Sequence, residues 1–387
     1  MSTLDTLRDL ERRMTDLTRA IHEKNLKEEP GKLEPKRYSM KEAAALIGRS
    51  YNAIRQKELE GNLPEPEMGS NGRRLGYTLA DINRAREEFG TRMGRAPTDP
   101  GITLAFPNFK GGSAKSTTSV HAAQFLAEAG LRTLLIDVDP QASATSSFGY
   151  SPDDDIPDEG TLLPYLEGER ESLDYCIRRT YWDGLDLIPA NLMLFNVEYR
   201  MAAEASSVAL QRLRVGIESI QDRYDVVLLD PPPALGMISL SVMHAANALV
   251  IPTPASYYDL NSTRAFLTML VEIAESLQNY DVPVDYRFIR LLITRLDENS
   301  ESQSKLVEIL PDILGTHMLR HTIRRTAALD RAGVHGRTIY EMTSENMPRK
   351  TWVRALNHFN RANAEILHLI RRSWPSHAEA LRAAAEI

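Results

Sequence analysis

The sequence predicts an α/β fold in which a mostly parallel sheet is doubly wound, with helices on both faces. Five apolar runs alternate with helix-like segments from residue 102 onward. Each run is a nearly continuous stretch of Val, Leu and Ile, as expected for strands that are buried on both faces of a parallel sheet. The runs are residues 102–106, 134–138, 225–230, 248–251 and 288–294. Because 387 residues exceed one ordinary domain, we expect a further unit ahead of residue 102.

Composition and charge exclude several classes of protein. No apolar run approaches the ~18 residues of a membrane span, and the first residues lack the charged start and apolar block of a signal peptide. Cys176 is the single cysteine, so a disulfide framework or thiolate cluster within one chain is excluded and a reducing cytoplasm is expected. Residues 1–97 carry 19 Lys and Arg against 16 Asp and Glu, whereas the whole chain has a net charge of −7. A slightly basic front end before an acidic body is compatible with local contact to nucleic acid.

The first 26 residues are expected to form a dimerisation helix. Apolar residues recur in residues 4–24 at spacings of 3, 4, 3 and 4, which is the seam of a short coiled coil. They are Leu7, Leu10, Met14, Leu17 and Ile21. A helix that packs back on its own domain is the alternative. The charged stretch from Lys27 to Pro35 then indicates a linker.

Residues 36–95 are predicted to form a small DNA-binding unit. Ser39 with Glu42 makes a capping box for a first helix, Gly48 ends that helix, and Ser50 caps a second helix that runs to Leu59. Side chains near the start of the second helix would face the major groove; these are Ser50, Tyr51, Asn52, Arg55 and Gln56.

A hairpin and a third helix complete this unit. Asn71-Gly72 is a strong turn signal, and the two residues after it, Arg73 and Arg74, could touch phosphates as a wing. Thr78 caps the third helix. The whole stretch resembles a MerR-like winged helix-turn-helix domain. Residues 96–101 are expected to be a linker.

The segment from Phe106 to Thr118 predicts a phosphate-binding loop between a strand and a helix. Gly111 and Gly112 let the backbone close around an anion, Lys115 can reach the β- and γ-phosphates of ATP or ADP, and Ser116 can place its hydroxyl on Mg²⁺. The usual glycines of such a loop are replaced by Phe109 and Ala114, and Lys110 adds a second lysine. This lysine-doubled loop resembles the deviant Walker A motif of the ParA/MinD group of P-loop NTPases.

Carboxylates at the ends of two further strands complete the expected site. Asp230 follows four apolar residues, which is the Walker B form of a carboxylate near Mg²⁺. Asp137 and Asp139 belong to a segment that resembles the D-x-D-P-Q motif of ParA-type ATPases. The resemblance implies that Asp139 orients the attacking water, while Asp137 supports the Mg²⁺ region.

The resemblance to ParA-type partition ATPases covers residues 36–372, with the ATPase domain at 102–372 and a tail at 373–387. It implies that Lys110 crosses a dimer interface to the partner's phosphates, so that Lys110, Lys115 and Asp139 are the catalytic residues. The nucleotide contacts that it implies are Lys110, Gly111, Gly112, Ser113, Ala114, Lys115, Ser116, Thr117, Pro254 and Thr294. Ala114 departs from the family pattern; we expect it to fit without a positive φ and to slow hydrolysis.

A cluster of arginines in the acidic C-terminal part predicts contact with DNA phosphates. It comprises Arg320, Arg324, Arg325, Arg331 and Arg337. A solvated helix face is the alternative.

The leading interpretation is a cytoplasmic, nucleoid-associated partition ATPase. It would bind DNA as an ATP-bound dimer and would not associate with a membrane. A ParB/RepB-like centromere-binding protein would stimulate it, and its front domain would repress its own operon. The alternatives are a repressor with a degenerate ATPase body, or a metabolic or MinD-like ATPase.

Overall fold

The computed structural model describes residues 3–25, 34–204, 207–279, 284–343 and 346–385. Its centre is a sheet with the order β3-β4-β2-β5-β1-β6-β7, in which only the edge pair β3–β4 is antiparallel. The predicted α/β class is therefore confirmed. The strands are β1 Ile102–Ala105, β2 Thr133–Asp137, β3 Arg178–Arg179, β4 Leu185–Ile188, β5 Val226–Asp230, β6 Ala248–Pro254 and β7 Phe288–Thr294. All five predicted strands are present, and β3 and β4 are additions to them.

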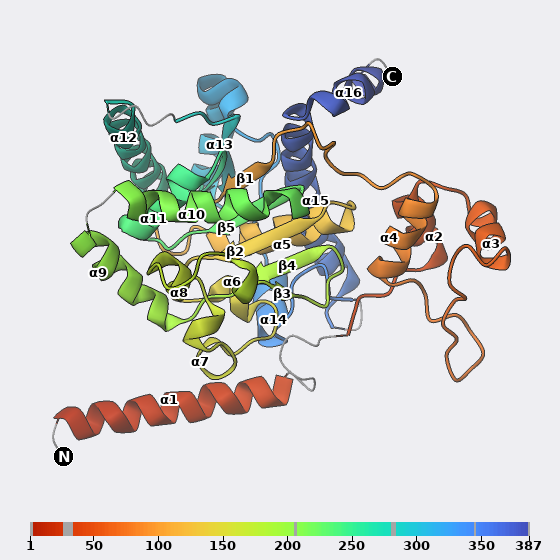
Figure 1. Cartoon of the computed structure of the whole chain (residues 1–387), viewed down its shortest axis with the longest axis horizontal. Coiled ribbons are helices and arrows are strands. Elements are labelled where there is room, and N and C mark those ends of the chain that lie inside the picture. The colour runs from red at the N-terminus through yellow and green to blue at the C-terminus, as the bar shows by residue number, and fades with distance from the viewer. Residues whose placement is uncertain (1–2, 26–33, 205–206, 280–283, 344–345, 386–387) are drawn as a thin grey trace.

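Helices cover both faces of this sheet (Figure 1). Alternate residues of β5 point to opposite faces, so Val226 and Leu228 pack with α5 (Lys115–Glu128) and α15 (Arg349–Arg372). Val227 and Leu229 pack with α10 (Ser207–Ile220) and α11 (Met237–Ala245) on the other face. The remaining helices of this body are α6 Ser143–Ser146, α7 Pro152–Asp155, α8 Leu163–Leu166, α9 Phe195–Glu204, α12 Tyr257–Asn279, α13 Glu301–Leu314, α14 Ala327–Val334 and α16 Ala378–Ala385. Short 3₁₀ turns lie at Asp158–Gly160, Asp174–Cys176, Leu192–Leu194, Gln221–Arg223, Gly315–His317 and Pro375–His377.

Three helices form the unit ahead of the sheet: α2 (Met40–Ile47), α3 (Tyr51–Leu59) and α4 (Leu79–Glu88). Their starts follow the predicted caps, since Ser39 and Glu42 form a capping box and Ser50 Oγ accepts from Ala53 N. Gly48 ends α2 with a φ of 72°, a left-handed conformation that glycine adopts without steric cost. Asn71-Gly72 makes a tight turn that brings Met68 opposite Arg74.

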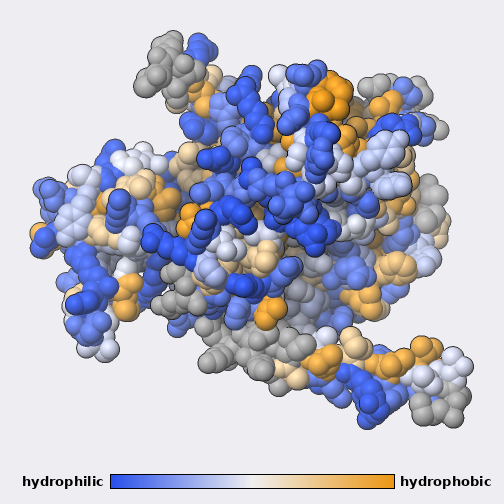
Figure 2. Space-filling model, turned by 180° about the vertical axis from the view of Figure 1, so that it is seen from behind, coloured by the Kyte–Doolittle hydropathy of each residue, from blue (hydrophilic) through white to orange (hydrophobic). Residues whose placement is uncertain are grey.

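Helix α1 (Thr3–Asn25) carries an exposed apolar stripe. Leu7, Leu10, Met14 and Leu17 are each more than half exposed, while the side chain of Ile21 lies outside the described ones. Figure 2 shows apolar surface along the helix that lies beneath the body. An ion pair between Arg19 and Asp154 joins α1 to the body at 3.0 Å. The stripe therefore has no cover from the described part of this chain.

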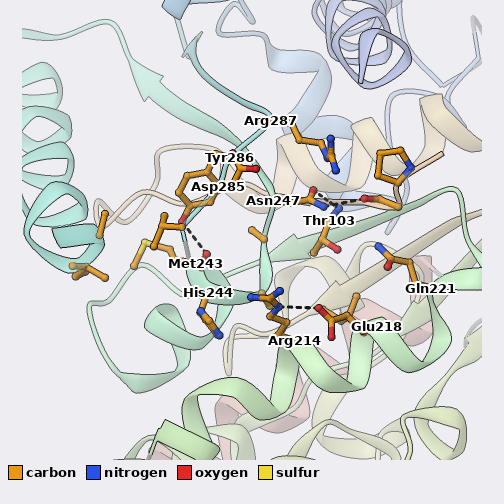
Figure 3. Close-up of a pocket in the computed structure, with 18 of the residues that line it drawn as sticks. Thr103, Arg214, Glu218, Gln221, Met243, His244, Asn247, Asp285, Tyr286 and Arg287 are labelled. Atoms are coloured by element: carbon orange, nitrogen blue, oxygen red, sulfur yellow. Dashed lines mark hydrogen bonds and ion pairs between the residues drawn. The ribbon is translucent and has the colours of Figure 1, made fainter. Parts of the chain in front are cut away.

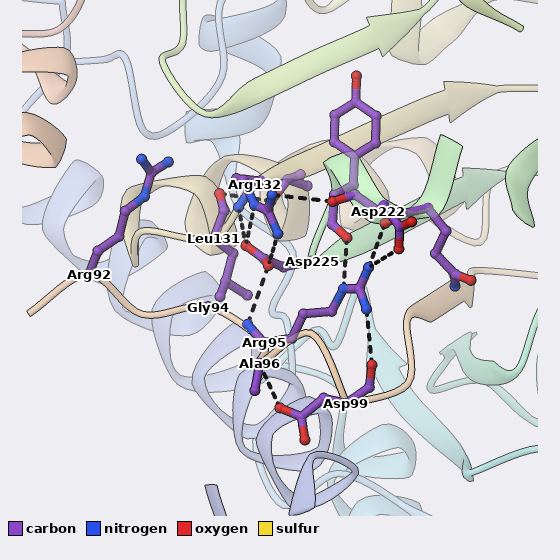
Figure 4. A network of polar contacts seen from close by, with 12 residues as sticks. Arg92, Gly94, Arg95, Ala96, Asp99, Leu131, Arg132, Asp222 and Asp225 are labelled. Carbon is purple, nitrogen blue, oxygen red and sulfur yellow. Dashed lines mark hydrogen bonds and ion pairs between the residues drawn. The ribbon is translucent and has the colours of Figure 1, made fainter. Parts of the chain in front are cut away.

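The expected linker at 96–101 is packed against the body instead of forming a free connection. Arg95 donates to the backbone carbonyls of Gln221 and Tyr224, and its backbone N–H donates to Asp225 (Figure 4). Asp99 is buried and accepts from the backbone of Ala96. Arginine donors and backbone acceptors thus replace the water that a flexible linker would bind.

The expected tail after residue 372 is also packed. Trp374 is buried and donates from Nε1 to the Pro100 carbonyl, and Ser376 donates from its backbone to Asp99. The chain's last described helix, α16, therefore follows a segment that closes over residues 99–100. Among the described residues, no helix combines the length and apolar character that a membrane crossing requires.

Candidate nucleotide-binding site

The phosphate-binding loop lies between β1 and the first turn of α5. Within the described residues, the backbone N–H groups of Gly111, Gly112, Ser113 and Ala114 donate no hydrogen bond. Lys115 is the first residue of α5 and is only 6% exposed. Burial lowers the pKa of Lys115, and the charges of Asp230 and Asp139 act in the opposite direction. Unpaired N–H groups at a helix start, beside a buried lysine, make an anion-binding nest.

Ala114 differs from what the sequence suggested. It has a φ of 69° and ψ of 31°, in the left-handed region, whereas we expected it to avoid a positive φ. The loop geometry that glycine ordinarily supplies is kept, and the methyl group makes it strained. Gly112, two residues earlier, also has a positive φ, of 75°.

Two carboxylates meet at the ends of β2 and β5, because Asp137 and Asp230 are register partners on these parallel strands. The oxygens of Asp137 accept from Thr145 N at 2.8 Å, from Thr145 Oγ1 at 2.7 Å and from Asp139 N at 3.2 Å. Burial and the neighbouring charge of Asp230 raise the pKa of Asp137 well above its usual range. These contacts suit the supporting role expected of Asp137.

Asp230 is fully buried, and neither of its oxygens accepts a hydrogen bond of ordinary geometry from the described residues. Burial raises the pKa of Asp230 to about 7, and the nearby Ser116 hydroxyl opposes that rise. A buried carboxylate without partners, next to a hydroxyl, fits the oxygen ligands that Mg²⁺ prefers. No cluster of three His, Cys, Asp or Glu residues that could hold a metal occurs in the described ranges. Protein sites hold Mg²⁺ through one or two carboxylates together with phosphates and water.

Asp139 lies just beyond β2 and is 6% exposed. Its Oδ1 accepts from Gln141 N at 2.9 Å. Burial raises its pKa, while Gln141 N and Lys115 lower it. Asp139 and Lys115 are therefore electrostatic neighbours.

Lys110 forms an ion pair with Asp259, in the first turn of α12. Asp259 also accepts from the Ser256 hydroxyl and is 9% exposed, whereas the Lys110 side chain is 40% exposed. The second lysine thus lies beside the loop and is held within its own chain in this state.

The ends of β6 and β7 close the other side of the loop. Pro254 and Thr294 are register partners, and Thr294 Oγ1 donates to the Ser113 carbonyl at 3.0 Å. Arg295, which the sequence reasoning did not select, donates from Nη1 to the Gly112 carbonyl at 2.6 Å. Gly112 and Arg295 border a cavity of about 700 Å³ that Ala114, Thr117 and Arg325 also line. Its size and its place beside the loop suit a nucleotide.

The candidate DNA residues of the front domain are mostly exposed. Ser50, Tyr51, Asn52, Arg55 and Gln56 all point to solvent from the start and outer face of α3, and Arg73 is exposed at the turn. Arg74 instead pairs with the buried Glu58 at 3.0 Å and donates to the Tyr77 hydroxyl at 2.9 Å. Arg74 therefore fixes the hairpin to α3.

The C-terminal arginines lie around a larger basic surface. Arg320 and Arg325 are exposed, Arg337 is half-buried beside the cavity, and Arg324 pairs with Glu298. A groove of about 730 Å³ joins Arg324 to the start of α15. Its other basic residues, which the sequence reasoning missed, are Arg349, Lys350, Arg354 and Arg361. Their spacing on one helix was the available signal.

A separate pocket of about 300 Å³ lies near the starts of β1, β6 and β7 (Figure 3). Thr103, Asn247 and Arg287 line it, together with Arg214 and Glu218 of α10. Ligands of open parallel sheets bind outside the carboxyl ends of the strands, and this pocket is at the opposite ends. It is therefore distinct from the phosphate-binding loop.

The fold and the loop place this chain among the P-loop NTPases. A family model described as an AAA domain matches residues 101–282. SopA of Escherichia coli K12 is 36% identical over 351 residues, which are 88% of this chain and 90% of SopA. A putative replication protein A of Sinorhizobium fredii is 32% identical, over 88% of this chain and 87% of that protein. The chain belongs to the ParA family of partition ATPases.

Solved structures share the fold of this chain. A structure named "Partition Protein" has a TM-score of 0.67 at 19% identity, covering 96% of this chain and 99% of that one, which shows a shared fold. Cobyrinic acid a,c-diamide synthase of Mycobacterium smegmatis has a TM-score of 0.51 at 28% identity, over 59% of this chain and 88% of that one. That enzyme was solved with an ATP analogue and magnesium.

Proposed function

We propose that this protein is an ATP-dependent DNA partition ATPase that works as a nucleotide-controlled dimer. The observation that carries the proposal is the convergence of Lys115, Ser116 and Asp230 on a loop of unpaired N–H groups, with Lys110 beside it. A simple nucleotide-binding protein needs the first three residues; the second lysine is the addition that a dimer-activated ATPase requires.

In this proposal, ATP or ADP lies in the cavity, with its phosphates in the nest from Gly111 to Thr117 and on Lys115. Ser116 and Asp230 would hold Mg²⁺, which supplies positive charge to the phosphate oxygens when it is bound. Asp139 orients the attacking water, and Asp137 keeps the loop after β2 in place through Thr145. Pro254 and Thr294 border the nucleotide at the ends of their strands.

Lys110 contributes from the partner subunit. A cation that crosses a dimer interface offsets the charge that develops on the transferred phosphoryl group, in the manner of an arginine finger. Because Lys110 is paired with Asp259 in the single chain, reaching a partner requires that this ion pair open. Hydrolysis thereby depends on dimerisation, and the exposed stripe of α1 supplies a second contact between copies.

DNA is bound in two ways. Without sequence preference, phosphates contact the basic groove formed by Arg324 and the start of α15, together with Arg320, Arg325, Arg331 and Arg337. With sequence preference, α3 of the front domain reads an operator through Ser50, Tyr51, Asn52, Arg55 and Gln56, and Arg73 contacts the backbone. The second mode represses the protein's own operon.

DNA binding by the dimer keeps the protein on the nucleoid in the cytoplasm. A centromere-binding partner of the ParB/RepB kind stimulates hydrolysis, and hydrolysis releases the dimer from the DNA. The competing function is a repressor whose ATPase body is degenerate, and the strained Ala114 is the observation that favours it. Turnover of ATP with and without DNA separates the two.

The test measures particle size and affinity for a random-sequence DNA duplex with ATP, with ADP and without nucleotide. We expect ATP, unlike ADP or the absence of nucleotide, to strengthen the dimer and to give tight, salt-sensitive DNA binding. The variant Lys115→Gln is expected to lose both effects of ATP. Equal DNA affinity in all three states, with no saturable Mg²⁺-dependent nucleotide binding, would refute the proposal.

A further inference from the structure

Arg295 is the residue beside the phosphate-binding loop to which the family motifs assign no role. It directly follows β7 and has a φ of 51°, in the left-handed region, although it is not glycine. Such conformations persist where surrounding contacts fix them, and they gather at functional sites. From this conformation its side chain reaches the loop, where Arg295 Nη1 donates a hydrogen bond to the Gly112 carbonyl at 2.6 Å.

Thr294 makes the matching contact one residue along each segment, because its Oγ1 donates to the Ser113 carbonyl at 3.0 Å. Two consecutive side chains at the end of β7 therefore hold two consecutive carbonyls of the loop. All peptide bonds of the described residues are trans. In a trans peptide, the carbonyl of one residue and the N–H of the next residue point in opposite directions. Holding the carbonyls of Gly112 and Ser113 on the β7 side turns the N–H groups of Ser113 and Ala114 the other way.

Those two N–H groups have no acceptor among the described residues, and the orphan hydroxyl of Ser113 is buried next to them. Left alone, a loop with glycines at 111 and 112 has many conformations in which these groups diverge. A nest binds an anion more tightly when its N–H groups already converge before the ligand arrives. The entropy cost of ordering the loop then does not reduce the free energy of binding.

We propose that Arg295 is a positioning residue which, together with Thr294, orients the Ser113 and Ala114 N–H groups toward the phosphates of bound ADP or ATP. This inference rests on the nucleotide site of the proposed function. Arg295 acts through the Gly112 carbonyl, and its left-handed backbone is what brings the guanidinium across the loop. The nest is thus completed by two residues that lie 181 and 183 positions away from their partners in the sequence.

The test uses the full-length protein and two ligands, Mg²⁺-ADP and inorganic pyrophosphate, the second of which has phosphates and no base or ribose. Arg295→Met keeps the length of the side chain and removes the donor. We expect affinity for both ligands to fall by about tenfold, which is the effect of one hydrogen bond near a charged group. Arg295→Lys, which retains a donor, is expected to recover part of the loss.

Two further variants separate positioning from general stability. Arg295→Gly also lacks the donor but relieves the left-handed backbone, so its affinity should fall while the thermal midpoint of the nucleotide-free protein does not. Arg287→Met is the control. Arg287 directly precedes β7, at the opposite end of that strand from the loop, so the change should leave both affinities unchanged.

The possible failures are distinct. If the wild type shows no saturable ADP binding, the proposed function fails. If the wild type binds ADP and both Arg295→Met and Arg295→Gly bind it equally well, the positioning role is wrong. If ADP affinity falls and pyrophosphate affinity does not, Arg295 contacts the nucleoside and the inference is likewise overturned.

Discussion

Replacing Ala114 by glycine measures the strain that this chain holds in its phosphate-binding loop. Ala114 has a φ of 69° and a ψ of 31°. The left-handed conformation costs an L-residue about 1–2 kcal/mol, and glycine removes that cost. Glycine also gives the unfolded chain more freedom, which lowers stability by about 0.4–1 kcal/mol. We therefore expect Ala114→Gly to raise the free energy of unfolding of the nucleotide-free protein by about 0.5–1 kcal/mol.

The matched control lies at the other end of the same helix. Ala129 follows α5 with a φ of −71°, an ordinary right-handed conformation with no strain to relieve. Ala129→Gly should lower the free energy of unfolding by about 0.5–1 kcal/mol. The difference between the two variants therefore isolates the backbone strain at Ala114.

Urea denaturation followed by tryptophan fluorescence provides the assay, with the unfolding midpoint of each variant compared with that of the wild type. Equal destabilisation by Ala114→Gly and Ala129→Gly would refute the argument, because it would mean that the left-handed alanine carries no cost. ATP turnover of Ala114→Gly then tests a separate expectation. Faster turnover would support the idea that the methyl group slows hydrolysis, and unchanged turnover would contradict it.

Three further predictions follow from individual contacts. Asp259→Asn frees Lys110 from its half-exposed ion pair, so dimerisation with ATP should occur at about two- to fivefold lower protein concentration, which corresponds to about 0.4–1 kcal/mol. An unchanged concentration in analytical ultracentrifugation would show that the pair does not restrain Lys110. Asp230 has a folded-state pKa of about 7 against an ordinary 3.8, so its favourable contribution is full below about pH 4 and is lost as the pH rises through 7. Asp230→Asn should therefore raise the thermal midpoint more at pH 8 than at pH 5, without nucleotide or Mg²⁺, and an equal gain at both pH values would contradict the burial argument. Arg324→Ala combined with Arg325→Ala should weaken ATP-dependent binding to random DNA and reduce the salt slope by about 1–2, at ~0.9 for each phosphate contact; Arg264→Ala on α12 is the control, and an identical slope in the double variant would exclude this surface.

The parts of the site that the sequence predicted are those set by short segments. Lys115 and Ser116 follow a strand and glycines within a few residues, and Asp230 ends an apolar run, so their places at the carboxyl edge of the sheet followed from chain direction alone. Asp137 was likewise expected at a strand end near the loop, whereas its register with Asp230 came from the structure. Strand β4 escaped notice because Leu185–Ile188 is four residues long and includes an aspartate, Asp186.

Contacts between segments that are distant in the sequence could not be predicted from it. Nothing local to Lys110 or Asp259 indicates that the two side chains meet across 149 positions of sequence. The left-handed φ of Arg295 was equally hidden, because arginine carries no conformational signal of the kind that glycine does. Such features depend on which strands become neighbours, and that is decided by the whole sheet.

The junction between the front helices and the body shows the same limit most clearly. Glu128 ends α5 and accepts from Lys36 and from the Tyr38 hydroxyl, while the buried Arg86 of α4 donates to the Glu128 carbonyl at 2.8 Å. Asp225 directly precedes β5 and accepts from the Arg95 backbone and from Arg132 (Figure 4). Helix α5 and strand β5 are thus held at one end by residues 36–95 and carry Lys115 and Asp230 at the other. A sequence pattern that predicted two units joined by a free linker lacked this information, because arginine and aspartate in a polar stretch are typical of solvated loops. Burial turns the same residues into a rigid joint, since each buried charge here needs the partner that the other unit supplies.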